Sequence, residues 1–302
     1  MMPISAVFDL TTTQRLDVYV SEVAKITRSR AVALIEDGNI LVNGKNASKN
    51  TKLKKGDLIE IQIPDLVEPE AIPEDIPIDI VYEDDDLLVV NKPKGMVVHP
   101  AAGHYTGTLV NAILFHCGSS LSGINGVLRP GILHRIDMNT SGLLIIAKND
   151  ASHQFLAEQI KEHSFTREYE AIVYGNIKNE EGRIEAPIGR HPVMRKKMAV
   201  TDKNSKEAIT EYTVIARYNG FTHLSLKLFT GRTHQIRVHM SYMGHPVAGD
   251  EVYGPKKVIT SLNGQCLHAK KLGFIHPKTK EYMEFESDLP KYFTDFIKKI
   301  NN

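Results

Sequence analysis

A loop of polar residues at positions 134–141 separates two apolar segments of the sequence and contains a single acidic residue, Asp137. The segment after it, residues 143–147, is entirely apolar and predicts a buried strand. A loop in this position lies at the edge of a hydrophobic core, where a carboxylate is partly desolvated yet accessible to a substrate. Asp137 is therefore a candidate catalytic residue, although the same local pattern also suits an aspartate that caps a turn.

Two metal-binding interpretations of the polar residues fail. The loop that starts at Asp137 matches the first positions of a calcium loop, but its twelfth position is Lys148, where a bidentate glutamate is needed. His234 and His239 are five residues apart, so they do not share a helical face, and no carboxylate or thiolate joins them. The two cysteines are far apart and lack CxxC spacing, which disfavours a zinc site or a disulfide framework. We therefore expect no bound metal.

A second group of polar residues lies at positions 230–240, where a glycine precedes a predicted helix. The helix is expected over residues 233–243, because Ile236 and Met240 recur at the spacing of a buried helical face. The other side chains then face a groove or its rim, where arginines suit the pairing of phosphate or carboxylate. These side chains are Arg232, His234, Gln235, Arg237 and His239.

Two shorter segments add a basic turn and an aromatic side chain. Residues 91–100 contain Lys92 and His99 and predict a basic turn between strands, for which an ordinary hairpin is the alternative. Residues 166–171 begin a strand that contains Tyr169. Core packing alone is the alternative explanation for this aromatic residue.

The elements that position these residues belong to two parts of the chain, and the first is a small α/β module. Helices are expected over residues 16–23 and 29–37, since apolar residues recur there at helical spacing and Gly38 ends the second helix. A hairpin follows at residues 40–44, where Asn-Gly is the strongest short turn signal. Alternating isoleucines predict a strand over residues 57–63.

A segment rich in proline and acidic residues separates this module from a larger body. Strands outnumber helices in the body and many follow one another directly, which favours an α+β fold with a mostly antiparallel mixed sheet. The expected strands are 87–91, 143–148, 169–174, 211–216 and 223–228, and the expected helices are 151–163 and 233–243. The predicted domains are residues 1–63 and 78–302, joined by a linker at 64–77.

The composition excludes several classes of protein. Of the 302 residues, 42% are hydrophobic and 24% are charged, as in globular proteins, and no apolar run approaches the ~20 residues that span a bilayer. The N-terminus lacks the features of a secretory signal, so we expect a cytoplasmic protein. Residues 64–90 hold ten acidic and no basic side chains, whereas the flanking parts carry net charges of +2 and +9. Two basic bodies suit a polyanionic partner, although a solvated linker beside ordinary surface charge is the alternative.

Several short runs in the first module carry a more specific signal. They are Thr-Arg-Ser-Arg-Ala at 27–31, Ile-Leu-Val-Asn-Gly at 40–44 and Gly-Asp at 56–57. With these runs the module resembles the S4-like RNA-binding domain, whose helix pair and hairpin present basic side chains to structured RNA. The resemblance implies that Arg28 and Arg30 contact RNA. An α/β appendage without that function is the alternative.

Four segments of the larger body occur in a characteristic order. They contain Asn-Lys-Pro-Lys-Gly at 91–95, His-Arg-Ile-Asp at 134–137, Arg-Glu-Tyr at 167–169 and Gly-Arg-Thr-His-Gln-Ile-Arg at 231–237. Together they resemble the RluA/RluD family of pseudouridine synthases, and the likeness covers essentially the whole chain. Residues 97–103, Val-Val-His-Pro-Ala-Ala-Gly, resemble the RluD branch, which modifies the helix-69 stem-loop of large-subunit ribosomal RNA.

This resemblance implies roles for individual residues. Asp137 matches the catalytic aspartate, which acts at the ribose as nucleophile or as base, and Tyr169 matches the tyrosine that stacks on the uracil. Arg232 matches the arginine that pairs with the aspartate, and Arg135 is expected to contact RNA near the vacated base position. Further RNA contacts are expected from His134, Thr140, Lys92, His99, Gln235 and Arg237.

The implied reaction breaks the bond from uracil N1 to ribose C1′, turns the base and joins C5 to C1′, with no cofactor and no metal. The expected partner is structured RNA, either large-subunit ribosomal RNA or a ribosomal precursor particle, and the chain is expected to act as a monomer. Two rival interpretations remain. One is the same reaction on another ribosomal or transfer RNA uridine, and the other is a non-catalytic RNA-binding factor in ribosome assembly.

Overall fold

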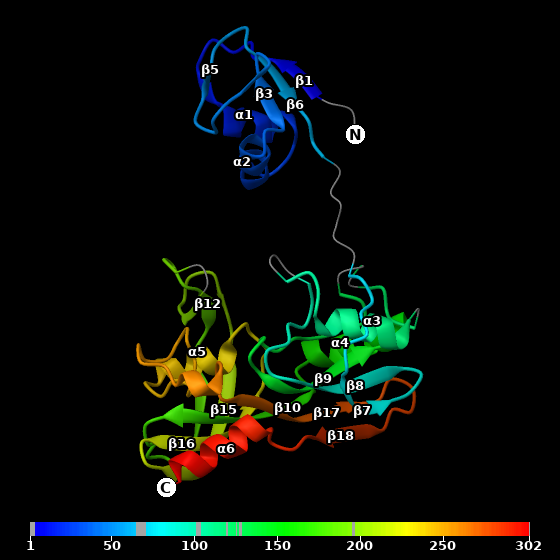
Figure 1. The fold of residues 1–302 in the computed structure, drawn as a ribbon, viewed down its shortest axis with the longest axis vertical. Helices are drawn as coiled ribbons and strands as arrows, with labels where there is room; N and C mark the ends of the chain where they lie inside the picture. The colour runs from blue at the N-terminus through cyan, green and yellow to red at the C-terminus, as the bar shows by residue number, and fades with distance from the viewer. Residues whose placement is uncertain are drawn as a thin grey trace. The chain divides into compact units, whose positions relative to one another are not determined.

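The chain forms two compact units, Met1–Glu68 and Pro69–Asn302, and each has a hydrophobic core of its own. Figure 1 draws both units of this computed structural model. The division between them falls inside the segment that the sequence predicts to be a linker. No helix in the described residues is long and apolar enough to cross a membrane. The described residues are 4–64, 71–100, 104–118, 120–124, 126, 129–194 and 197–301.

In the N-terminal unit, two helices pack against a small antiparallel sheet (Figure 1). Helices α1 (Leu16–Val23) and α2 (Arg28–Glu36) lie within one residue of their predicted positions. The predicted hairpin is also present, and its turn residues Asn43 and Gly44 have φ values of 52° and 73°, as this tight turn requires. The strands are β1 (Ile4–Val7), β2 (Gln14–Arg15), β3 (Ile40–Val42), β4 (Lys45–Asn46), β5 (Lys52–Leu53) and β6 (Leu58–Ile61).

The larger unit is built on a nine-stranded sheet, and the five strands predicted from the sequence all belong to it. The strands are β7 (Asp79–Glu83), β8 (Leu87–Lys92), β9 (Ser141–Ala147), β10 (Thr166–Tyr174), β11 (Glu181–Glu185), β15 (Ile209–Tyr218), β16 (Phe221–Leu228), β17 (Leu267–Ile275) and β18 (Tyr282–Glu286). Their order is β11-β15-β16-β10-β17-β9-β8-β7, and β18 also pairs with β17. Among the described pairs of this sheet only β17 and β9 are parallel, which confirms the prediction of a mostly antiparallel α+β fold.

Within the described residues, a three-stranded sheet and four helices complete this unit. The small sheet contains β12 (Ile188–Arg190), β13 (Met198–Val200) and β14 (Ser205–Lys206). The helices are α3 (Leu109–Cys117), α4 (Asp150–Lys161), α5 (Gln235–Tyr242) and α6 (Lys291–Ile300), and a 3-10 turn, η1, spans Thr260–Leu262. Helices α4 and α5 were predicted from the sequence, whereas α3 and α6 were not.

The large sheet is buried on both faces where it carries the polar loop. Leu88 and Val90 of β8 belong to the core that contains α3 and α5, while Leu87 and Val89 belong to the core that contains α4. Strand β9 lies beside β8 and divides its side chains between the same two cores. Burial on both faces explains why residues 143–147 form an unbroken apolar run rather than an alternating one.

The second half of the predicted linker is attached to the larger unit. The amide N–H of Glu74 donates to the carbonyl of Asn111 at 3.0 Å, and the Asn111 side chain donates to the carbonyl of Ile72 at 2.7 Å. The N–H of Gly107 in turn donates to the Glu74 carboxylate. This part of the segment therefore packs beside α3, while residues 65–70 lie outside the described residues.

Candidate active site

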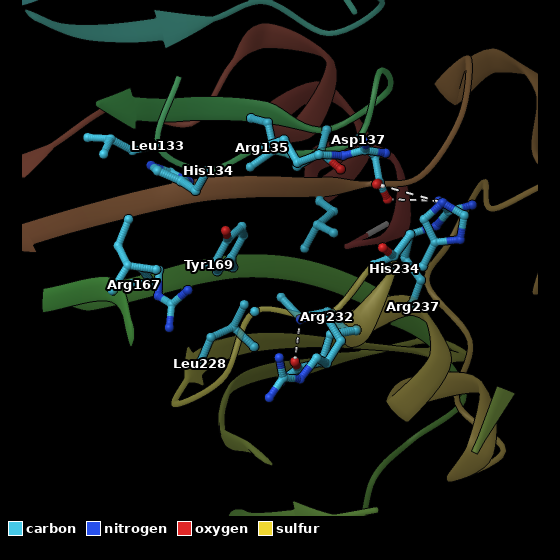
Figure 2. Close-up of a pocket in the computed structure, with 18 of the residues that line it drawn as sticks. Leu133, His134, Arg135, Asp137, Arg167, Tyr169, Leu228, Arg232, His234 and Arg237 are labelled. Atoms are coloured by element: carbon cyan, nitrogen blue, oxygen red, sulfur yellow. Dashed lines mark hydrogen bonds and ion pairs between the residues drawn. The ribbon is translucent and has the colours of Figure 1, made fainter. Parts of the chain in front are cut away.

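A cavity of about 510 Å³ lies in the larger unit, where three of the four polar segments converge (Figure 2). Asp137 and Arg135 come from the loop before β9, Tyr169 from β10, and Arg237 from α5. A neighbouring cavity of about 260 Å³ shares Asp137 and Arg237 and is also lined by His99 from the fourth segment. The fold thus brings segments that are up to 140 residues apart in the sequence together around the carboxylate of Asp137.

Asp137 is held by an arginine that is itself fixed by a second aspartate. Nη1 of Arg237 donates to Oδ2 of Asp137 at 2.8 Å (Figure 2). The same guanidinium donates through Nε and Nη2 to both oxygens of Asp250, at 2.6 and 3.0 Å. Asp250 is fully buried, and its Oδ1 also accepts the backbone N–H groups of Val252 and Tyr253. Arg237 is therefore oriented before any substrate arrives.

The electrostatics keep the Asp250–Arg237 ion pair ionised. Burial acts to raise the pKa of Asp250, but hydrogen bonds from Arg237 more than offset it, so the pKa lies below its usual value. Burial alone would lower the pKa of Arg237, yet the two carboxylates raise it well above its ordinary value. The side chain of Asp137 remains 19% exposed, so it can be reached from the cavity.

The predicted pairing of Arg232 with Asp137 is wrong, because Arg237 takes that position. Nε of Arg232 donates instead to the carbonyl of Glu207 at 2.7 Å. The helix begins at Gln235, two residues later than predicted, and His234 before it has a left-handed backbone with a φ of 58°. This change of chain direction puts Arg232 on a different wall of the cavity from Arg237 (Figure 2).

His234 lies on the other oxygen of Asp137. Its Nε2 is 3.7 Å from Oδ1 of Asp137, and its Nδ1 is 2.9 Å from the hydroxyl of Tyr253. That hydroxyl accepts the N–H of Met198 at 2.8 Å, so its own proton is directed to Nδ1 of His234. Burial lowers the pKa of His234, with Asp137 opposing, which favours a neutral ring with its N–H on the Asp137 side.

Sequence reasoning missed Asp250 and Tyr253. Asp250 follows the buried pair Val247 and Ala248, and an acidic residue directly after an apolar pair and a glycine is an unusual pattern. That pattern was the available signal, since a carboxylate in such a place needs a cationic partner. Tyr253 offers no comparable signal, because a tyrosine near a turn is common on protein surfaces.

Tyr169 lines the cavity from strand β10, between Arg167 and Asp137 in the view of Figure 2. It is 8% exposed and belongs to the hydrophobic core that includes α5. Burial raises the pKa of Tyr169, so its hydroxyl stays protonated. Tyr169 therefore packs in the hydrophobic core and also lines the cavity.

Three residues that were predicted to contact RNA have their polar atoms occupied inside the protein. Lys92 is 1% exposed, Thr140 is 2% exposed and Gln235 is 3% exposed. The hydroxyl of Thr140 accepts from Gln265, while Gln235 bonds Thr230, Thr210 and neighbouring backbone groups. The sequence does not show which polar side chains bond internally. Thr140 and Gln235 still line the larger cavity, and for all three residues the RNA contact stays a prediction.

The other predicted RNA contacts differ in their surroundings. Arg237 forms ion pairs with two carboxylates. His134 accepts the N–H of Ile145 at 3.4 Å, and burial lowers the pKa of His134 to about 3. Arg135 is exposed and lines both cavities. His99 is 7% exposed, and burial lowers its pKa to about 4.

Two further predicted contacts lie in the N-terminal unit. Arg30 is half-buried, whereas Arg28 donates to the buried Asp17 at 2.9 Å. The Arg28 side chain is still 56% exposed. Residues 101–103, which carry part of the resemblance to the RluD branch, lie outside the described residues.

Lys92 fixes the loop that carries Asp137. Its Nζ donates to the carbonyls of Pro93, Met96 and Met138, at 2.8, 2.8 and 3.1 Å. The carbonyl of Met138 also accepts the N–H of Gly95. Burial lowers the pKa of Lys92 to about 7, which the Asp137 carboxylate opposes. Three acceptors match the three protons of an ammonium group, so Lys92 joins two loops directly behind the candidate catalytic residue.

Replacing Lys92 by methionine is expected to lower the free energy of unfolding by about 3 kcal/mol, because three buried carbonyls lose a donor. Urea unfolding measures the change. Lys291→Met is the matched control, since that side chain is 87% exposed, and its effect is expected within about 0.5 kcal/mol. Equal stability of the two variants would show that Lys92 does not hold the loop.

The sequence of the chain is similar to those of known RNA pseudouridine synthases. Residues 86–242 match the family described as RNA pseudouridylate synthase, and residues 14–59 match the S4 domain. An uncharacterized RNA pseudouridine synthase of Bacillus subtilis is 50% identical over 274 residues, covering 91% of this chain and 89% of the relative. Ribosomal large subunit pseudouridine synthase D of Zymomonas mobilis is 46% identical over 282 residues, covering 90% and 88%.

A solved structure extends the comparison to three dimensions. Human RNA pseudouridylate synthase domain containing 1 superposes with a TM-score of 0.57 at 26% identity, and the match covers 74% of this chain and 94% of the human chain. The sequence matches and this fold confirm the resemblance inferred from the motifs. The chain belongs to the RNA pseudouridine synthase family, with an S4 domain ahead of the synthase body.

Proposed function

We propose that this enzyme converts uridine to pseudouridine in large-subunit ribosomal RNA, in the helix-69 stem-loop, with Asp137 as the catalytic residue. The observation that carries the proposal is the chain of ion pairs from Asp250 through Arg237 to Asp137, which faces Tyr169 across the cavity. The name of the relative from Zymomonas mobilis, ribosomal large subunit pseudouridine synthase D, supports the choice of RNA.

In this proposal the target uridine leaves its stem-loop and enters the larger cavity. Unstacking a base costs a few kcal/mol, which contacts by exposed basic residues such as Arg135 and Arg28 offset. Tyr169 stacks on the uracil, and Asp137 acts at ribose C1′ either as nucleophile or as base. The N1–C1′ bond breaks, the base turns, and C5 bonds to C1′. C5 then loses its proton and N1 gains one, so that the product is an isomer of uridine.

The remaining residues of the cavity set the conditions for this reaction. Arg237 holds the carboxylate of Asp137 in place through their ion pair, so that either role starts from a fixed position. Apolar side chains line part of the wall, including Leu133, Leu228 and Leu267. They limit the access of water, which would otherwise attack a ribosyl intermediate and release the base.

Mapping of pseudouridine in RNA from a deletion strain tests the proposed target. We expect the pseudouridines of the helix-69 stem-loop to disappear, and to return when the wild-type gene but not the Asp137→Asn gene is supplied. Loss at another ribosomal or transfer RNA uridine would correct the target and leave the reaction standing. An unchanged map, with a growth defect rescued equally by both genes, would favour an assembly factor instead.

A further inference from the structure

Arg167 is a buried cation on the wall of the active-site cavity. It is 6% exposed, its Nε has no hydrogen-bond partner among the described residues, and its Nη2 donates to the carbonyl of Phe229 at 3.5 Å. No ion pair between Arg167 and a carboxylate occurs within the described parts of the chain. A guanidinium does not discharge at physiological pH, so this charge is buried without compensation from the described residues.

Arg232 brings a second positive charge to the same wall. It lines the cavity with Arg167, and its charge lowers the pKa of Arg167 in addition to the effect of burial. Among the described residues its side chain bonds through Nε to the carbonyl of Glu207, which leaves the two terminal nitrogens available. Figure 2 shows both guanidinium groups away from the Arg237–Asp137 ion pair, with Arg167 beyond Tyr169.

The glycine at position 231 leaves room for the Arg167 guanidinium. A Cβ at Gly231 would lie 2.8 Å from Nη1 of Arg167, which is closer than such atoms approach in proteins. Gly231 does not have a left-handed backbone, so its conformation does not by itself require glycine. The absence of a side chain at position 231 is instead explained by the position of Arg167.

We propose that Arg167 and Arg232 form a binding site for one backbone phosphate of the RNA strand that carries the target uridine. The proposal rests on the proposed function, because it takes RNA as the substrate. Two guanidinium groups without carboxylate partners match the charge and the oxygen geometry of a phosphate. A phosphate bound beyond Tyr169 holds the strand while Asp137 reacts with the ribose on the other side of the ring.

The salt dependence of RNA binding tests the site. A transcript of the helix-69 stem-loop is titrated with protein at several salt concentrations, with Asp137→Asn present in every protein so that the RNA is not converted. Each lost phosphate contact lowers the slope of log K against log salt by about 0.7 to 0.9. We expect that decrease for Arg167→Gln, together with about tenfold weaker binding at low salt.

Three variants make the result specific to the site. Arg167→Lys keeps the charge, so its slope is expected to stay close to that of the parent protein. Gly231→Ala keeps the arginine but displaces its guanidinium, so it is expected to weaken binding even if Arg167→Gln folds poorly. Arg217→Gln removes an arginine that pairs with Glu180 outside the cavity and is expected to leave the slope unchanged.

An unchanged slope in both Arg167→Gln and Gly231→Ala would overturn the phosphate site. So would a loss of turnover when Arg167→Gln is made alone, in protein that keeps Asp137, with the affinity and slope of the Asp137→Asn forms unchanged, since Arg167 would then act on the base. Conversion of the transcript by wild-type protein is measured separately. Its absence would count against the proposed function, while the slopes would still decide the site.

Discussion

Replacing Asp137 by asparagine is expected to reduce the rate of pseudouridine formation by about 10⁴-fold, while the protein still folds and binds RNA. An amide has nearly the shape of the carboxylate but is neither a nucleophile nor a base at neutral pH. Asp137 makes one ion pair and is 19% exposed, and Arg237 keeps its pairing with Asp250. The free energy of unfolding is therefore expected to change by only about 1 kcal/mol.

Three measurements on purified protein separate catalysis from folding. Single-turnover conversion of a stem-loop transcript gives the rate, filter binding gives the affinity for RNA, and urea unfolding gives the stability. Asp202→Asn is the matched control, because it makes the same change at an exposed position. Residual activity close to that of wild type would remove Asp137 from the reaction, and an unfolded variant would make its role structural.

The sequence predicted the parts of the fold in which local pattern and burial agree. Helices α1 and α2, the Asn43-Gly44 hairpin and five of the nine strands of the large sheet all have strong local signals. Helix α3 was missed, because Leu109–Cys117 is apolar on most sides and its 3.6-residue period is obscured. Its start is marked by a capping box between Thr108 and Asn111, which a closer search for caps would have found.

The candidate site was predicted less completely than the fold, because its geometry depends on the start of one helix. Arg232 and Arg237 occur in the same short motif, and the sequence alone does not show which of them pairs with Asp137. The left-handed turn at His234 and the buried carboxylate of Asp250 decide in favour of Arg237. Both features follow from tertiary packing rather than from the motif. The same holds for Lys92, whose burial depends on three carbonyls from two separate loops.

Replacing Arg237 by methionine is expected to destabilise the protein by about 3 to 5 kcal/mol at neutral pH and to lower activity strongly. The variant leaves Asp250 fully buried without its cation, and removing one partner of a buried ion pair has an effect of this size. Asp137 at the same time loses the guanidinium that holds its carboxylate in place. Urea unfolding and single-turnover conversion measure the two effects.

The double variant Arg237→Met with Asp250→Asn separates these two consequences. Removing the unpaired carboxylate is expected to restore most of the stability, because a neutral amide is less costly to bury than a charge. Activity is expected to stay low, since Asp137 still lacks its partner. If the double variant regained activity together with stability, Arg237 would serve the fold alone and have no role in positioning Asp137.

The pH dependence of stability gives an independent test of the same ion pair. In the wild type the pKa of Asp250 lies below its ordinary value of 3.8, so its contribution is present above that pH and is lost as pH falls through the folded-state pKa. Without Arg237, burial is expected to raise that pKa above 3.8, so the unfolded state ionises first and the penalty grows as pH rises. The stability difference between wild type and Arg237→Met is therefore expected to be largest at neutral pH and to shrink towards pH 4. A difference that stays constant over this range would show that lost packing, rather than the charge of Asp250, destabilises the variant.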